Sequence, residues 1–360
     1  MRKVEADVKG NLIVLTLLPP SAENVALARA VPGRRYRAND HAWTAPATAS
    51  VAAEIIDLWG AADVQGTPGF DELLRSAGAL IAAQSAKVAD NLEQPAIRKC
   101  DSWQHQLRGY HFAYPQKAAC LYMGMGSGKS KIVVDLIINR DHRRVLIVAP
   151  KSVITGECEL GRSASLDALA VWAREFYKFA GHDKWKVWND TRGTCERRAE
   201  KMSDFIKMCD ARGDVAVVLV NYEAAWRPEM AEAIYKANFD LVVIDESHKA
   251  KSSNGTASRF LGKLGDTVPY RLALTGTLMP HSPMDLFGQY RFLDKGVFGT
   301  SFTAFRARYA VMGGYGGHEI KGYQHEDELR AKAERLYYHV GSEVLDLPEA
   351  VHTYRVVSLE

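Results

Sequence analysis

The chain has 360 residues, of which 47% are hydrophobic and 25% are charged, and its formal net charge is +3. This length leaves room for about two domains, and the composition is ordinary for a soluble globular protein. The net charge is the small difference between 46 basic and 43 acidic residues, so it does not argue for a polyanionic partner. Binding to nucleic acid therefore has to be argued from local motifs.

The five cysteines are odd in number and include no CxxC pair: Cys100, Cys120, Cys158, Cys195 and Cys209. This pattern favours reduced thiols over a disulfide framework or a zinc site. Neither a signal peptide nor an apolar run of membrane-spanning length is apparent. We therefore expect a soluble, cytoplasmic protein with no membrane partner.

The first 60 residues predict a small α+β domain. Lys3–Val8 and Leu12–Leu18 are expected to be short strands, and Ser21 is a plausible N-cap for the helical pattern that follows. A further strand is predicted to end at Trp43, before a second helix at Ser50–Trp59. Residues 61–98 are expected to be a helical connector.

The RRYR cluster, residues 34–37, lies beside Trp43 and admits two interpretations. It could bind nucleic acid through phosphate contacts and stacking. It could equally be a solvated basic turn beside a core tryptophan. The connector that follows is predicted to contain one helix, Phe70–Asn91.

From about residue 100 onward, apolar strands alternate with helical segments. Such short, continuous apolar runs are typical of strands buried on both faces. Because helices separate them, we expect a parallel α/β sheet with helices on both faces. The predicted strands are Ala118–Met123, Val145–Ala149, Val215–Val220, Leu241–Asp245 and Arg271–Thr275.

The first predicted strand runs into a glycine-rich loop and then into a helix, which is the context that a P-loop requires. Backbone N–H groups of such a loop surround a polyphosphate, and the helix dipole favours the anion. Lys129 would reach the β- and γ-phosphates, and Ser130 would hold Mg²⁺. Met123 stands where the general pattern has its first glycine. The predicted nucleotide-binding residues are Gly124, Gly126, Ser127, Gly128, Lys129, Ser130 and Lys131.

Paired carboxylates end the strand Leu241–Asp245. In a P-loop enzyme Asp245 would complete the Mg²⁺ shell, and Glu246 would orient and deprotonate the attacking water. His248 follows two residues later and is included in the predicted catalytic set with Lys129.

The strand Arg271–Thr275 also ends in polar residues. The hydroxyls of Thr275 and Thr277 flank Gly276 and could bond to His248 and Glu246, which would couple the nucleotide state to neighbouring loops. Ligands of parallel sheets bind at the carboxyl ends of the strands, and these motifs all fall there.

Residues 100–360 resemble superfamily 2 helicases and, within them, the Swi/Snf-like DNA translocases. The chain departs from that pattern at an insertion, Thr155–Val171, at Ser247 in place of alanine, and at Leu278 in place of proline. The segments that carry the resemblance occur in the family's order: WQHQLRG, MGMGSGKS, VLIVAPKSVI followed by WAREF, VNYEA, DESHKAK, LALTGTLMPHSPMDLFGQYRFLD and LDLPEA.

The resemblance implies a RecA-like fold, ATP and Mg²⁺ as cofactors, and movement along double- or single-stranded DNA; RNA is left open. Gln106 looks like the glutamine that reads adenine. Core packing is the alternative for Tyr222. By position in the family's motifs, the residues expected to face the nucleic-acid backbone are Pro150, Lys151, Ser152, Asn221 and Tyr222.

Residues 99–360 are expected to form the first RecA-like domain of such a motor. The family needs a second one, whose arginines complete the catalytic site. No second domain is apparent here, because Phe302–Val340 is expected to be helical with a Gly-rich loop, Gly313–Gly317. We therefore expect a fragment, or half a motor completed by another polypeptide, that hydrolyses ATP slowly alone. Residues 1–60 are faintly similar to the HARP-like module of annealing helicases.

Two other functions remain open. One is a nucleic-acid-binding protein whose nucleotide site is a regulatory switch without motor activity. The other is a P-loop kinase or small-molecule ATPase, which would leave the TGT segment and Gln106 unexplained.

Overall fold

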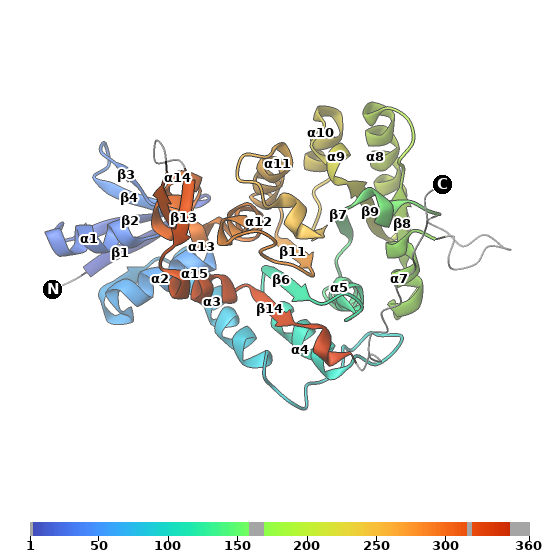
Figure 1. The fold of residues 1–360 in the computed structure, drawn as a ribbon, viewed down its shortest axis with the longest axis horizontal. Helices are drawn as coiled ribbons and strands as arrows, with labels where there is room; N and C mark the ends of the chain where they lie inside the picture. Colours follow the sequence, from blue (N-terminus) through green and yellow to red (C-terminus); the bar gives the residue numbers. More distant parts are fainter. Residues whose placement is uncertain (1–2, 158–168, 315–318, 346–360) are drawn as a thin grey trace, which may run out of the picture.

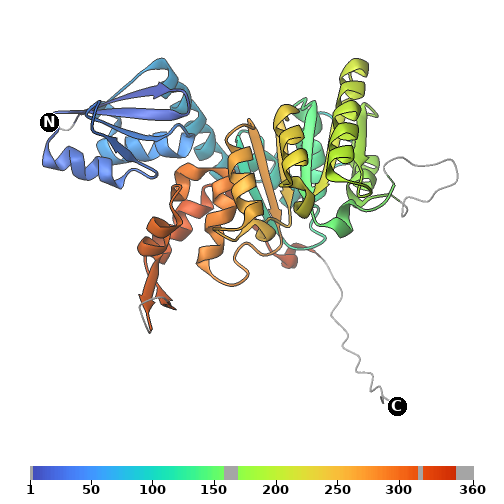
Figure 2. The ribbon, with the colours of Figure 1, turned by 90° about the horizontal axis from the view of Figure 1, so that it is seen from above.

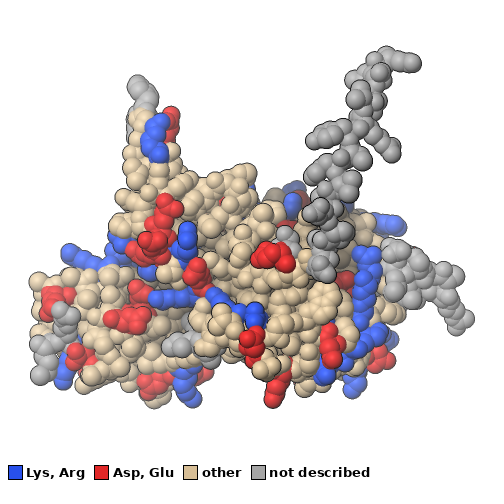
Figure 3. Space-filling model, turned by 60° about the horizontal axis from the view of Figure 1, so that its bottom comes forward, with Lys and Arg blue, Asp and Glu red and all other residues tan. Residues whose placement is uncertain are grey.

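The structure is a computed structural model, which describes residues 3–157, 169–314 and 319–345. A small N-terminal unit lies beside a larger α/β unit, and a short helical and hairpin segment lies between them (Figure 1). Lys/Arg and Asp/Glu side chains are interspersed over the face shown in Figure 3, as the near balance of 46 basic and 43 acidic residues leads one to expect. No helix of the described part of the chain is long and apolar enough to cross a membrane.

Within residues 3–86, five strands form the small sheet in the order β3-β4-β2-β1-β5. Alternate residues of β2, among them Ile13 and Leu15, are buried against the helices, with Trp59 and Phe70 in the same core. The elements are β1 (Lys3–Lys9), β2 (Leu12–Leu18), α1 (Ala22–Ala30), β3 (Arg35–Arg37), β4 (Ala42–Pro46), α2 (Ala49–Trp59), β5 (Val64–Gly66) and α3 (Pro68–Ala86).

The first two predicted strands, now β1 and β2, and both helices of this unit are confirmed, and the Ser21 hydroxyl caps α1 by accepting from the Asn24 N–H. The strand predicted to end at Trp43 is wrong: β3 and β4 are separate strands, and Trp43 lies inside β4. The expected helical connector also contains a strand, because β5 pairs in parallel with β1. Helix α3 ends at Ala86 rather than Asn91, whose φ of 58° is not helical.

The larger unit is built on a seven-stranded parallel sheet, counted over the described residues, in the order β14-β6-β11-β10-β7-β9-β8. The RecA-like α/β fold is thereby confirmed. The strands are β6 (Ala118–Met123), β7 (Arg144–Ala149), β8 (Trp185–Asn189), β9 (Val215–Asn221), β10 (Leu241–Asp245), β11 (Tyr270–Thr275) and β14 (Tyr337–Val340).

The five predicted strands are the central ones, and the two that were missed, β8 and β14, are the edges. A central strand is apolar on both faces, whereas an edge strand carries polar residues where it meets water. The sequences of the two edge strands, WKVWN in β8 and YYHV in β14, are therefore short and mixed in polarity.

Helices cover both faces of this sheet, and Figure 2 shows them on either side of it. Helices α4, α5 and α7 share one core with the sheet, and α8, α10, α11 and α12 share the other. The helices are α4 (Gln104–Ala113), α5 (Lys129–Asn139), α6 (Lys151–Ile154), α7 (Val171–Phe179), α8 (Cys195–Arg212), α9 (Tyr222–Ala225), α10 (Pro228–Lys236), α11 (Thr256–Gly265), α12 (Leu286–Leu293) and α13 (Lys295–Phe298).

The helical prediction for Phe302–Val340 is wrong in part. Helices α14 (Phe302–Tyr309) and α15 (Glu326–Glu334) enclose an antiparallel hairpin, β12 (Ala310–Gly313) and β13 (Glu319–Tyr323), before the chain enters β14. Most of β13 is exposed, so its sequence carries no buried face to recognise. Parts of the Gly-rich loop, of the insertion and of the LDLPEA segment lie outside the described residues.

Candidate nucleotide site

The loop between β6 and α5 has the backbone that the glycine pattern predicts. Gly126 and Gly128 have φ of 78° and 88°, a left-handed region that favours glycine. At Gly128 a Cβ atom would also lie 2.2 Å from the Gln106 side-chain nitrogen. Met123, the residue that replaces the first glycine of the pattern, ends β6, is fully buried and has no positive φ. A side chain is therefore tolerated there.

Lys129 lies at the start of α5 with its ammonium folded back over the loop. Its Nζ donates to the backbone oxygens of Met123 and Gly124 at 2.9 and 3.1 Å. Burial lowers the pKa of Lys129, and the nearby carboxylates of Glu246 and Asp245 oppose that shift. The structure thus brings the predicted phosphate-binding cation and the predicted acidic pair into one site.

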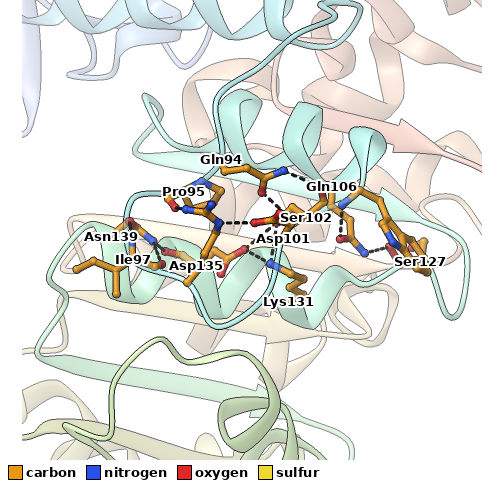
Figure 4. A network of polar contacts seen from close by, with 12 residues as sticks. Gln94, Pro95, Ile97, Asp101, Ser102, Gln106, Ser127, Lys131, Asp135 and Asn139 are labelled. Carbon is orange, nitrogen blue, oxygen red and sulfur yellow. Dashed lines mark hydrogen bonds and ion pairs between the residues drawn. The ribbon is translucent and has the colours of Figure 1, made fainter.

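Gln106 lies on α4 against the loop, as the resemblance implies. Its Nε2 donates to the Ser127 backbone oxygen at 3.2 Å, and its Oε1 accepts from the Trp103 N–H at 3.0 Å (Figure 4). His105 contacts the same Ser127 oxygen at 2.9 Å. The Nε2 of Gln106 can donate one more hydrogen bond and its Oε1 can accept one more. The amide is therefore held in place and still able to bind a ligand.

Lys131 is a correction to the predicted nucleotide-binding set. Its ammonium is buried and lies 2.7 Å from both Asp135 Oδ2 and Ser102 Oγ, behind the loop (Figure 4). A turn of 100° per residue places Lys131 on the side of α5 away from Lys129. Its side chain therefore supports the helix from behind rather than contacting phosphate.

Asp245 is the last residue of β10, and Glu246 follows it in the turn after the strand. Glu246 has φ 52° and ψ 55°, a conformation uncommon for a non-glycine residue and typical of functional sites. Asp245 Oδ2 accepts from the Trp172 indole N–H at 3.2 Å. Burial raises the pKa of Asp245; the Trp172 hydrogen bond opposes this shift, and the charge of Glu246 adds to it. A bound cation would reverse the shift by favouring the carboxylate.

His248 joins the acidic turn to the TGT segment. Its Nδ1 lies 3.2 Å from Glu246 Oε2 and 3.4 Å from Thr275 Oγ1. Thr275 Oγ1 also accepts from the Thr277 N–H at 3.0 Å. The structure therefore brings the predicted coupling residues Thr275 and Thr277, on either side of Gly276, next to His248. The expected hydrogen bond from a threonine to Glu246 is replaced by an indirect connection, in which His248 contacts both Thr275 and Glu246.

Gln289 on α12 is a residue that the sequence reasoning missed. It is fully buried, its Oε1 accepts from Ser247 Oγ at 2.7 Å, and its Nε2 donates to the Leu278 backbone oxygen at 2.7 Å. It thus connects the two positions, Ser247 and Leu278, where this chain departs from the family pattern. A glutamine within the apolar run LFGQYRFL is the signal that could have revealed it.

We expect Gln289→Leu to lower the free energy of unfolding by about 1–3 kcal/mol, because it orphans the buried Ser247 hydroxyl. Combining it with Ser247→Ala should restore part of that loss. Chemical denaturation of both variants measures the difference. If the double variant is no more stable than Gln289→Leu alone, the hydroxyl is not the group that Gln289 serves.

The residues predicted to face nucleic acid separate into two groups. Lys151 and Ser152 are exposed at the start of α6, and Pro150 is half-buried beside them. Tyr222 is buried and its hydroxyl donates to the Asp245 backbone oxygen at 2.8 Å. Asn221 is also buried and donates to Glu223 Oε2 at 2.7 Å. Core packing, the alternative interpretation of Tyr222, is therefore the one that the structure supports, and the predicted contact of Asn221 with nucleic acid stays a prediction.

The donor set fits ATP with Mg²⁺. The Ser130 hydroxyl at the start of α5 and the Asp245 carboxylate at the end of β10 are oxygen ligands, which Mg²⁺ prefers.

Residues 79–313 match the SNF2-related domain. The chain belongs to this family. Residues 1–78 lie outside the match, so the HARP-like resemblance of residues 1–60 stays a prediction.

The SNF2-related relatives are distant. The chain is 27% identical over 222 residues to the ATP-dependent helicase FUN30 of Saccharomyces cerevisiae, a match that covers 60% of this chain and 18% of that protein. It is 25% identical over 167 residues to the human DNA repair and recombination protein RAD54B, covering 46% of this chain and 15% of that protein. Over 80 residues, 22% of this chain and 7% of the relative, it is 36% identical to the bovine DNA annealing helicase and endonuclease ZRANB3.

Among solved structures, the SWI2/SNF2 ATPase core of Sulfolobus solfataricus in complex with dsDNA matches with a TM-score of 0.53 and 21% identity. The match covers 72% of this chain and 49% of that chain. At this identity the likeness shows the fold. The chain spans less than half of that structure and a small part of the curated relatives.

Proposed function

We propose that this chain is the first motor domain, with a small N-terminal unit, of an ATP-dependent DNA translocase or helicase. The proposal places the start of the motor domain near residue 99. The observation that carries it is that Lys129 follows β6 while Asp245 and Glu246 end and follow β10, two strands that both pair in parallel with β11, so that all three residues lie at the carboxyl ends of neighbouring strands.

The roles of the residues follow from their positions. The loop N–H groups and Lys129 would bind the β- and γ-phosphates of ATP. Ser130 and Asp245 would hold Mg²⁺, which when bound neutralises charge that develops on the phosphates. Glu246 would orient and deprotonate the attacking water, held in place by His248. Gln106 would use its remaining amide capacity to read adenine.

Movement along DNA would be coupled to this site through neighbouring segments. His248 and Thr275 would transmit the nucleotide state from Glu246 to the TGT turn. Lys151 and Ser152 would contact the DNA backbone through phosphate, independent of sequence. A second RecA-like domain would supply the arginines that complete the site; an arginine finger in trans is worth ~10³–10⁵ in rate.

The test is the rate of ATP hydrolysis with and without double-stranded DNA, single-stranded DNA and RNA. It compares this chain, a version joined to a second RecA-like domain, and Lys129→Ala in each. We expect slow hydrolysis by this chain and DNA stimulation in the joined version, abolished by Lys129→Ala. If only RNA stimulates hydrolysis, the nucleic acid along which the motor moves is RNA rather than DNA. If nucleotide binds but nucleic acid stimulates hydrolysis in neither version, the proposed motor function is wrong and the site is a regulatory nucleotide site.

A further inference from the structure

A groove of about 870 Å³ runs between the small N-terminal unit and the segment α13–α15. One wall comes from α1, the turn after it, β3 and α2, and the other from α13, α14 and α15. Neither unit has the groove by itself. The cations that line it come from both walls: Arg29, Arg34, Arg35, Arg308 and Lys332.

The acidic residues of the groove are already neutralised. Glu54 lies 3.6 Å from Lys332 and 3.4 Å from Arg335, and Glu328 is paired with Arg308 and Lys332. In the part of the chain that the structure describes, no ion pair is formed by the three arginines that the small unit contributes to the groove, Arg29, Arg34 and Arg35. The groove therefore has an excess of positive charge, even though the chain as a whole is nearly neutral.

The two walls are held together by close contacts. A Cβ atom at Gly296 on α13 would lie 2.2 Å from Thr48 Oγ1 and 2.7 Å from Val51 Cγ2 of the small unit. The Glu54–Lys332 and Glu54–Arg335 ion pairs also cross between the units. The groove is thus preformed, which lowers the entropic cost of binding.

The RRYR cluster divides between two environments. Tyr36 pairs with Trp43 across the strands, with ring centroids 5.2 Å apart, and does not line the groove. Arg34 and Arg35 do line it, whereas the neighbouring Arg37 does not. The aromatic residue therefore packs on the small unit, and two of the arginines face the larger one.

We propose that this groove binds the phosphate backbone of DNA. The cations that line one groove come from α1, the turn after it, β3, α14 and α15, and five cations suit several phosphates of a polymer better than one small anion. The site lies apart from α6, since β14 and β8 form opposite edges of the sheet and the small unit lies at the β14 side (Figures 1 and 2). The chain would then bind DNA at two places, the groove and the start of α6. This inference rests on DNA being the track in the proposed function.

The test measures binding of the 360-residue chain to labelled duplex DNA, single-stranded DNA and RNA over a range of salt concentrations. The variant Arg34→Gln/Arg35→Gln removes two free cations of the groove. Arg37→Gln is the control, because it removes an exposed arginine of β3 that pairs with Asp40 and does not line the groove. Thermal unfolding of all variants checks that the fold is retained.

We expect the double variant to bind duplex DNA roughly tenfold more weakly, with the slope of log affinity against log salt reduced by about 2, near 0.9 for each phosphate contact. Arg37→Gln should leave both quantities near those of the parent. If both variants lose the same affinity for duplex DNA, or if the double variant loses none, the groove does not bind DNA. The proposed function would stand in either case. Binding of RNA but not DNA would overturn DNA as the occupant. A parent chain that binds no nucleic acid and, joined to a second domain, shows no DNA-stimulated hydrolysis would overturn both.

Discussion

Glu246→Gln is expected to lower the rate of ATP hydrolysis about 10²–10⁴-fold while leaving nucleotide affinity nearly unchanged. The amide keeps the size and the hydrogen-bonding reach of the carboxylate, but it cannot accept a proton from the attacking water. Binding of phosphates depends instead on the loop N–H groups and on Lys129. The structure adds that Glu246 is held in a left-handed conformation and lies 3.2 Å from His248, so its carboxylate is positioned rather than free.

Single-turnover hydrolysis and equilibrium binding of a labelled ATP analogue, both on the version joined to a second RecA-like domain, separate these two effects. Glu229→Gln on α10 is the control, since that residue is exposed and its helix packs against α8 and α9. A Glu246→Gln variant that hydrolyses ATP at the parent rate would remove Glu246 from the catalytic role. A variant that loses affinity by the same factor as rate would make it a binding residue.

Lys131→Met is expected to destabilise the fold by about 3–5 kcal/mol, because it leaves Asp135 as a buried, unpaired carboxylate. Burial already raises the pKa of Asp135, and the hydrogen bond from Lys131 is the main influence that opposes this rise. Without Lys131 the pKa of Asp135 rises further. Since the folded state then binds more protons than the unfolded state, the stability of the variant falls as pH increases through the shifted pKa. The loss should be larger at about pH 8 than at about pH 5.

Denaturant unfolding at both pH values measures this, and Lys178→Met is the matched control. Lys178 belongs to a partly exposed pair with Glu175, 3.8 Å apart, and such pairs contribute about 0–1 kcal/mol. Replacing both partners, as Lys131→Met/Asp135→Leu, should recover most of the stability, apart from the cost of the orphaned Ser102 hydroxyl. A single variant as stable as the parent would show that the ion pair contributes little. A loss independent of pH would show that Asp135 is not the charge left behind.

Much of the central fold was predictable from residue order alone. The runs Ala118–Met123 and Leu241–Asp245 are apolar because strands in the middle of a parallel sheet meet side chains on both faces. Gly126 and Gly128 mark a backbone that other residues rarely adopt, and Lys129, Asp245 and Glu246 stand at strand or helix ends, where the fold must bring them together. The apolar runs and the glycine positions depend on residues that are close in sequence, so the sequence alone predicts them.

What only the tertiary structure decided is how residues far apart in the chain meet. The edge strands β8 and β14 take their conformation from a neighbouring strand, so their own sequences are ambiguous. Tyr222 could have faced nucleic acid or the core, and its hydrogen bond to Asp245, 23 residues away, settles the matter. Gln289 acquires its role from Ser247 and Leu278. The basic groove exists because Arg34 and α14, separated by more than half the chain, line one surface. Contacts of this kind depend on packing geometry, which hydrophobic periodicity and motif spacing do not contain.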